Sequence, residues 1–246
     1  MPATPAWPPR SLPRLYVDPP LSAGIAVGLD PAQTNYLGNV LRLKEGGEVL
    51  LFDGVSGEWL ARVAEVGKRR MILGVIERAR EQECVPDLTL AFAPVKKGRV
   101  DWLVEKAVEL GVARLEPVIT RRTIVDKLNL ERMRIHIVEA AEQCGRTALA
   151  TIAEPLKLET WLKSLDTARR LYFADETGGE AAAASFKPGP AAILTGPEGG
   201  FTVEEAQAIR ASPNAIAISL GPRILRAETA ALAAITTYMA LAGDWR

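Results

Sequence analysis

The sequence predicts an α/β protein in two parts, a small N-terminal β-barrel and a domain with a mostly parallel sheet covered by helices on both faces. Two observations support this prediction. Up to about residue 80, apolar residues form short strand-like runs bounded by Gly, Asp and Pro. After Pro86, strand-like and helical patterns alternate, which is typical of parallel strands joined by helices. We therefore expect a barrel domain over residues 1–80 and a second domain over residues 86–246.

In the first part, four apolar runs predict strands and one segment between them predicts a helix. The helix is expected over Gln33–Leu43, because Tyr36, Leu37, Val40 and Leu41 would then share one face. The predicted strands are Arg14–Val17, Glu48–Phe52, Glu58–Val63 and Met71–Ile76.

In the second part, five buried-type strands alternate with four helices. One helix would present Val100, Leu103, Ala107 and Leu110 on one face and end at Gly111. The other helices are expected over Leu130–Cys144, from Thr202 with Glu205 as its capping-box partner, and in the alanine-rich C-terminal segment. The predicted strands are Leu88–Ala93, Arg114–Ile119, Arg170–Ala174, Ala191–Leu194 and Ala215–Leu220.

Composition excludes several classes of protein. With 246 residues, 48% of them apolar, the chain can form real hydrophobic cores. No transmembrane segment is expected, because the long apolar stretch Ala227–Ala242 contains Glu228 and several threonines. The proline-rich Met1–Pro13 lacks the apolar region of a secretory signal, so we expect a cytoplasmic protein. Two separated cysteines and one histidine, His136, predict no metal site, and His136 fits a helix surface better than a catalytic position.

The net charge is zero, with 30 basic and 30 acidic residues. This balance argues against a protein that coats nucleic acid nonspecifically, so an RNA-binding protein of this composition must cluster its charge. Candidate clusters are Lys68-Arg69-Arg70, Lys96-Lys97-Gly98-Arg99 and Arg121-Arg122. Each cluster taken alone is also compatible with an ordinary solvated surface.

Two loops follow buried strands at their carboxyl ends, where open α/β sheets bind ligands. The first is Leu194-Thr-Gly-Pro-Glu-Gly-Gly-Phe, whose glycines let the backbone approach a ligand closely. It lacks the residues of a phosphate-binding P-loop, and a plain tight turn is an equally good explanation. The second is Leu220-Gly-Pro-Arg-Ile-Leu-Arg-Ala-Glu-Thr-Ala-Ala, in which Arg226 and Glu228 either serve a ligand or simply pair on a helix surface.

These two loops resemble the signature motifs of the ribosomal RNA small subunit methyltransferase E family, which belongs to the SPOUT superfamily. The resemblance extends to four further segments, which are Ala93–Val112, Ala140–Arg146, Val40–Gly46 and Leu51-Phe-Asp-Gly. It covers nearly the whole chain and is weaker before Arg14 and over Leu156–Lys187. The chain departs from the family at Tyr36, where the family commonly has a histidine.

The resemblance implies a PUA-like barrel followed by a SPOUT domain with a C-terminal trefoil knot, and a homodimer as the working unit. It implies S-adenosylmethionine as cofactor and 16S ribosomal RNA of the small ribosomal subunit as partner, with methylation at N3 of a specific uridine. A membrane or a metal is not expected. Two alternatives remain: a SPOUT enzyme acting on another RNA such as transfer RNA, and a non-catalytic RNA-binding protein.

The chemistry of the implied reaction selects candidate residues. Uridine N3 must lose its imide proton before it attacks the methyl group, so a fixed cationic donor near O2 and O4 would lower the barrier. Arg226 is the first candidate for this donor, and Glu198 and Glu228 are candidates either for the proton acceptor or for a positional role. The expected cofactor-binding residues are Leu194, Thr195, Gly196, Pro197, Glu198, Gly199, Gly200, Leu220, Gly221, Ile224, Leu225, Arg226 and Thr229. The expected RNA-binding residues are Arg14, Arg42, Lys96, Arg122, Gln143 and Arg146.

Overall fold

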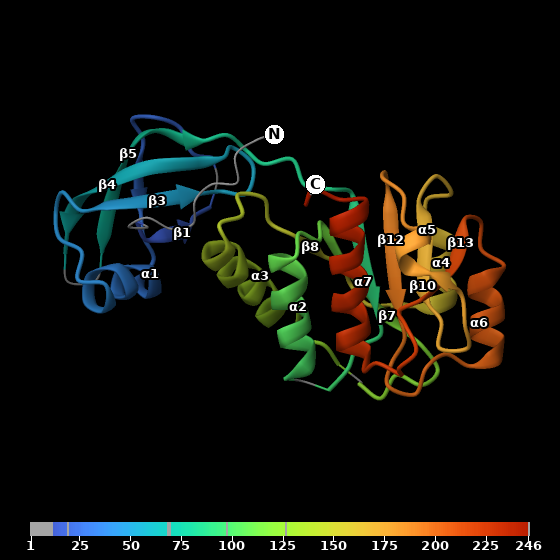
Figure 1. Cartoon of the computed structure of the whole chain (residues 1–246). Helices are drawn as coiled ribbons and strands as arrows, with labels where there is room; N and C mark the ends of the chain where they lie inside the picture. Colours follow the sequence, from blue (N-terminus) through green and yellow to red (C-terminus); the bar gives the residue numbers. More distant parts are fainter. Residues whose placement is uncertain (1–11, 19, 68–69, 97, 126, 246) are drawn as a thin grey trace. The chain divides into compact units, whose positions relative to one another are not determined.

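The computed structural model describes residues 12–18, 20–67, 70–96, 98–125 and 127–245. Lys68, Arg69 and Lys97 of the predicted basic clusters lie outside the described residues, as does most of the proline-rich N-terminal segment. The chain divides into two compact units. The first runs up to Glu83 and also includes Gly145–Ala148, and the second contains the remaining residues (Figure 1).

The first unit is a curled five-stranded sheet with strand order β1-β3-β4-β5-β2. The predicted strands are confirmed, and β4 and β5 run further than predicted. The pairs β3–β4, β4–β5 and β2–β5 are antiparallel, whereas β1 runs parallel to β3. The core contains Leu37, Val49, Leu51, Met71 and Leu73, none of which is exposed. The strands are β1 (Arg14–Tyr16), β2 (Ala26–Gly28), β3 (Glu48–Phe52), β4 (Glu58–Val66) and β5 (Met71–Arg80).

The helix expected over Gln33–Leu43 is only partly correct. The chain forms the short helix α1 (Pro31–Asn35), capped by Asp30, and continues as a π-helical turn η1 (Tyr36–Val40). Of the predicted apolar stripe, Leu37 alone is buried, while Tyr36, Val40 and Leu41 are exposed. The wider π turn changes the angle between successive side chains, so a spacing that fits an α-helix no longer describes one face.

The second unit contains an eight-stranded sheet in which every pairing is parallel, as the sequence predicts. Its strand order is β11-β13-β10-β12-β6-β7-β8, and β9 also pairs with β7. The central strands are buried on both faces, which explains their nearly continuous apolar sequences. The strands are β6 (Leu88–Phe92), β7 (Arg114–Ile119), β8 (Thr151–Ile152), β9 (Leu156–Lys157), β10 (Arg170–Ala174), β11 (Glu180–Ala181), β12 (Ala191–Thr195) and β13 (Ala215–Ser219).

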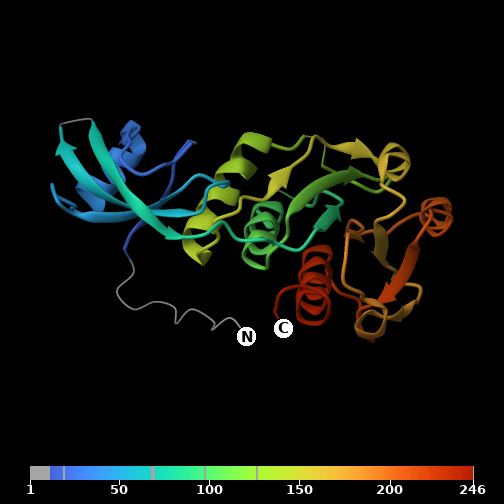
Figure 2. The same cartoon turned by 90° about the horizontal axis from the view of Figure 1, so that it is seen from above.

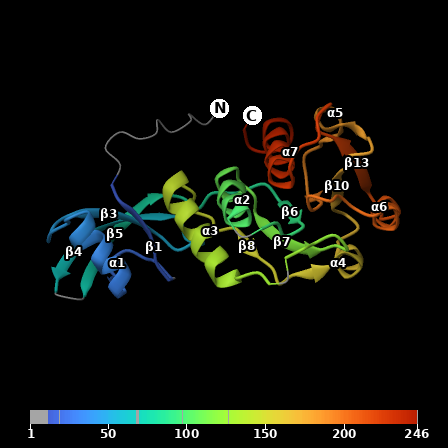
Figure 3. The same cartoon turned by 90° about the horizontal axis from the view of Figure 1, so that it is seen from below.

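Helices cover both faces of this sheet, as the views from above and below show (Figures 2 and 3). On one face, α4 and α6 pack against alternate residues of β10 and β12, including Leu171, Phe173 and Leu194. On the other face α7 packs against β12 between α2 and α5, and the Tyr238 ring meets Tyr172 of β10. The helices are α2 (Arg99–Glu109), α3 (Leu130–Cys144), α4 (Leu158–Ser164), α5 (Ala182–Ser185), α6 (Val203–Arg210) and α7 (Ala227–Leu241).

Among the residues that the structure describes, no helix is both long enough and apolar enough to cross a membrane. Across the same residues, no group of three or more His, Cys, Asp or Glu side chains is arranged to hold a metal ion.

Candidate functional site

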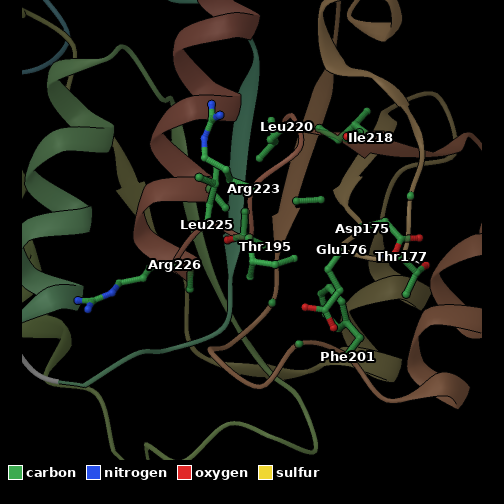
Figure 4. A pocket seen from close by; sticks show the side chains of 18 of the residues that line it. Asp175, Glu176, Thr177, Thr195, Phe201, Ile218, Leu220, Arg223, Leu225 and Arg226 are labelled. Carbon is green, nitrogen blue, oxygen red and sulfur yellow. Dashed lines mark hydrogen bonds between the residues drawn. The ribbon is translucent and has the colours of Figure 1, made fainter.

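A cavity of about 540 Å³ lies at the carboxyl ends of three neighbouring strands, β13, β10 and β12. Because these strands are parallel and adjacent, the loop after each one opens at the same edge of the sheet. Figure 4 shows Thr195 near the centre of the lining, with Asp175, Glu176 and Thr177 to one side of it. The lining comprises residues 174–178, 195–198, 200–201 and 218–227, with Ala206 and Ala230.

The loop after β12 makes a tight turn that depends on glycine. The amide of Gly200 donates to the carbonyl of Pro197 at 2.9 Å, and Gly200 has a φ of +67°. A side chain at Gly200 would also meet the Glu176 carboxyl carbon at 2.9 Å. At Gly196, a Cβ would lie 3.1 Å from the Phe201 ring. The loop therefore brings its backbone to the cavity where side chains have little room.

Residues that follow β7 hold this loop in place. The guanidinium of Arg122 donates to the carbonyls of Gly199 and Phe201, the latter at 3.3 Å. The predicted capping box is confirmed, because Thr202 accepts from the Glu205 amide at 3.2 Å and Glu205 accepts from the Thr202 amide at 2.9 Å. The second Glu205 oxygen accepts from the Arg121 amide at 2.7 Å, so one buried carboxylate joins the two loops.

The loop after β13 leads into α7, and Arg226 is the N-cap residue of that helix. Gly221 makes the turn with a φ of +110°, and Ile224 is 80% exposed although it lines the cavity. Among the described residues, the Arg226 guanidinium has no hydrogen bond or ion pair. Figure 4 shows that its side chain extends away from Thr195 and Asp175, so its donors are free for a group outside the cavity.

A third loop, Asp175–Gly178 after β10, completes the lining and was not singled out from the sequence. Asp175 accepts hydrogen bonds from the amide of Thr177 at 2.9 Å and from its hydroxyl at 2.7 Å, and it pairs with Arg210. These contacts use Asp175 to hold the loop, whereas Glu176 has no hydrogen bond or ion pair within the described part of the chain. This loop could have been identified from the sequence, because it directly follows a buried strand of the parallel sheet.

Arg99, the first residue of α2, joins the two candidate carboxylates. Its Nη1 lies 3.7 Å from Glu198 Oε1, and its Nε lies 3.7 Å from Glu228 Oε1. The Glu198 side chain is 38% exposed, whereas the Glu228 side chain is only 10% exposed. The sequence places Arg99 only in a basic cluster, because its two partners lie about a hundred residues or more further along the chain.

Both parts of the chain match models of known families. Residues 81–239 match an RNA methyltransferase domain, and residues 29–76 match an RNA methyltransferase PUA domain. Ribosomal RNA small subunit methyltransferase E of Rickettsia conorii is 32% identical over 228 residues, which cover 90% of this chain and 93% of that protein. The chain belongs to the ribosomal RNA small subunit methyltransferase E family.

Solved structures of similar proteins have the same fold. A methyltransferase E from Neisseria gonorrhoeae, bound to S-adenosylmethionine, is 30% identical with a TM-score of 0.88, and the match covers 96% of this chain and 100% of that one. A methyltransferase from Legionella pneumophila, in complex with the same cofactor, is 29% identical with a TM-score of 0.86, covering 95% and 99%. The predicted PUA-like and SPOUT parts are thus confirmed, and the trefoil knot stays a prediction.

Most of the cofactor-binding residues expected for this family line the cavity; Leu194, Gly199 and Thr229 do not. Leu194 is buried within β12, and Thr229 is exposed on α7. Gly199 faces Arg122, where a Cβ would lie 3.3 Å from the arginine side chain. Glu228 also lies outside the lining, since its side chain is buried beside Arg99.

The expected RNA-binding residues fall into two groups. Arg42, Lys96 and Gln143 are exposed, and Arg122 is exposed but donates to the glycine-rich loop. Arg14 is 8% exposed, pairs with Glu58 at 2.5 Å and donates to the Arg146 carbonyl at 2.8 Å. Arg146 is also buried. Because a buried guanidinium cannot reach an RNA phosphate without leaving its partners, the structure disfavours Arg14 and Arg146 as RNA contacts.

Proposed function

We propose that this protein uses S-adenosylmethionine to methylate N3 of one uridine of 16S ribosomal RNA, uracil 1498. The observation that carries the proposal is the cavity enclosed by glycine-rich and polar loops at the carboxyl edge of the sheet. The cofactor in the two solved relatives and the small-subunit RNA in the name of the curated relative support the cofactor and the substrate class.

The residues of the cavity fit this cofactor. A volume of about 540 Å³ lies within the range of small-molecule pockets, about 300–1,000 Å³. Ile218 and Leu225 offer apolar surface to an adenine ring, and the backbone of residues 195–198 offers polar groups to its edge. Glu176 and Glu198 present negative charge toward a ligand that carries a sulfonium and an amino group.

The bound cofactor supplies a methyl group activated by its sulfonium, and the residues of the chain prepare the uridine. Arg226 donates to a uracil carbonyl and stabilises the negative charge that spreads onto O2 and O4 as N3 loses its proton. A guanidinium suits this role because it stays charged and presents a planar set of donors. Glu198 accepts the proton, because it lines the cavity and is partly exposed, whereas the buried Glu228 is positional.

We further propose that two copies of the chain form the working unit in the cytoplasm. The chain has no net charge, so one copy has no overall excess of positive charge to attract an RNA. Two copies double the number of exposed candidate contacts, which are Arg42 in the first unit and Lys96 and Gln143 in the second unit. A monomeric variant that methylates its ribosomal substrate at the full rate contradicts this part of the proposal.

The deciding experiment identifies the modified base. The protein is incubated with methyl-labelled S-adenosylmethionine and small ribosomal subunits from a strain that lacks this modification, with transfer RNA as the parallel substrate. We expect label in 16S ribosomal RNA as N3-methyluridine at the proposed position. Label in transfer RNA, or at another atom, overturns the substrate assignment. If calorimetry detects no cofactor binding and no RNA is labelled, the protein is not a methyltransferase.

A further inference from the structure

Arg99 stands out among the charged residues near the cavity because it faces two carboxylates that come from different loops. Glu198 belongs to the loop after β12, and Glu228 belongs to the first turn of α7. Each carboxylate lies 3.7 Å from a different nitrogen of the same guanidinium. An arginine can hold two partners in this way because its donors form a rigid planar fork.

The two carboxylates differ in their surroundings. Glu228 is buried, and its Oε2 has no hydrogen-bond partner among the described residues. Its neighbouring charges are the Arg99 guanidinium and the N-terminus of α7, both of which favour a negative group. A buried carboxylate that loses its cationic partner is strongly destabilised, so Glu228 fixes the position of Arg99.

Glu198, in contrast, lies at the cavity in a loop built around three glycines. The Glu198 side chain makes no hydrogen bond among the described residues, and Arg99 is the one cation that contacts its carboxylate there. The Arg99 side chain is itself 41% exposed, and its guanidinium makes no hydrogen bond among the described residues. Its contact with Glu198 can therefore persist while the carboxylate faces a ligand.

We propose that Arg99 is a positioning residue of the methyl-transfer reaction, in which the buried Glu228 holds Arg99 and Arg99 in turn aims Glu198 at the substrate. The inference rests on the proposed function for its catalytic consequence, but the linkage of the three side chains is a property of the protein alone. Arg99 is not among the residues that line the cavity, and in the described part of the chain no hydrogen bond joins its side chain to the loop backbone. Its loss should therefore affect turnover more than cofactor affinity.

The first test measures the linkage without any activity. Urea unfolding of the wild type, Arg99→Ala, Glu228→Gln and the double variant gives the coupling between the two side chains. We expect a coupling of at least about fivefold in the unfolding equilibrium constant, as for contacting residues in one network. Arg134→Ala is the matched control, because Arg134 pairs with Glu131 on the exposed face of α3. A coupling no larger than that of the Arg134–Glu131 pair overturns the proposal.

The second test separates positioning from folding. We expect Arg99→Ala to lower kcat by about 10²-fold, the loss that a small misplacement of a reacting group can produce, with the dissociation constant of S-adenosylmethionine nearly unchanged. Arg99→Lys and added guanidinium ion should each restore part of kcat. In a Glu198→Gln background, Arg99→Ala should cause little further loss. Full turnover in Arg99→Ala, or an equal loss in both backgrounds, overturns the proposal. A wild type that shows the coupling but methylates no RNA refutes the proposed function instead.

Discussion

Gly200 is the position in the glycine-rich loop where the backbone demands glycine, and Gly200→Ala tests how far the loop depends on it. The φ of +67° lies in the left-handed region. For an L-residue this conformation costs about 1–2 kcal/mol. For a domain of this size a loss of 1 kcal/mol lowers Tm by about 2–4 °C, so we expect Gly200→Ala to melt about 2–8 °C below the wild type.

The same substitution should weaken cofactor binding. The new Cβ meets the Glu176 carboxyl group, which also lines the cavity, so the Glu176 side chain must move within the site. If the loop relieves its strain by leaving the binding conformation, each 1.4 kcal/mol raises the dissociation constant about tenfold. Calorimetry with S-adenosylmethionine measures this change directly. We expect a dissociation constant raised by about tenfold, in line with the strain energy.

Gly199→Ala is the matched control. Gly199 has no left-handed φ, and its Cβ would lie 3.3 Å from the Arg122 side chain, which needs to shift by only a few tenths of an ångström. A second control, the double variant Glu176→Ala with Gly200→Ala, removes the steric neighbour but keeps the backbone strain. It should recover only part of the lost stability. If Gly200→Ala matches Gly199→Ala in both Tm and affinity, the argument from backbone conformation is wrong.

Three further predictions concern the proposed catalytic arginine, a helix cap and acid stability. Arg226→Ala should lower kcat by about 10²–10³-fold, as for loss of an oxyanion donor, with an unchanged Tm; near-normal turnover would move the role to another residue. Thr202→Ala removes the cap of α6 and should cost about 1 kcal/mol of unfolding free energy in urea; no loss would contradict the capping role. A hydrogen bond from Arg169, and a smaller contribution from a hydrogen bond from Arg114, lower the pKa of Asp87 below its ordinary value of 3.8. The contribution of Asp87 to stability is therefore present above that value and is lost as the pH falls through the lowered pKa. Unfolding measured against pH should show this acid-dependent loss in the wild type and a smaller one in Asp87→Asn, and equal curves would contradict the assignment.

The parallel sheet could be predicted because burial on both faces leaves a direct mark on the sequence. Strands such as β6 and β12 read as unbroken apolar runs between turns. The elements that were missed carry no such mark. The strands β8, β9 and β11 have two residues each, and their pairing depends on neighbours that the local sequence does not reveal. The π turn at Tyr36–Val40 was also missed, because the spacing of its apolar residues fits an α-helix until it is known that only Leu37 of them is buried.

The parts of the site in which glycine and proline indicate a special backbone conformation could be predicted from the sequence. The parts in which residues distant in the sequence come together in the folded chain could not. The glycines after β12, and the Gly-Pro pair with its polar neighbours after β13, pointed to the two loops. Gly199 and Gly200 could not be distinguished until their φ angles were known. The role of Asp175–Gly178 follows from the sheet order β13-β10-β12, which brings three loops to one edge. Arg99 reaches Glu198 because β6 pairs with β12, a neighbour that the order of strands along the chain does not indicate.

Several arginines are held by partners within the protein itself, which bears on how the chain can bind RNA. Arg14 is engaged by Glu58, Arg122 by carbonyls of the glycine-rich loop, and Arg99 by Glu198 and Glu228. These cations stabilise the protein itself, so they neutralise few phosphates. Since affinity for RNA and its salt dependence both grow with the number of phosphates neutralised, a copy with few cations left for RNA would form only a weak electrostatic complex. Specific binding by such a chain would therefore need a contribution beyond this charge, such as a second copy or recognition of RNA shape and bases.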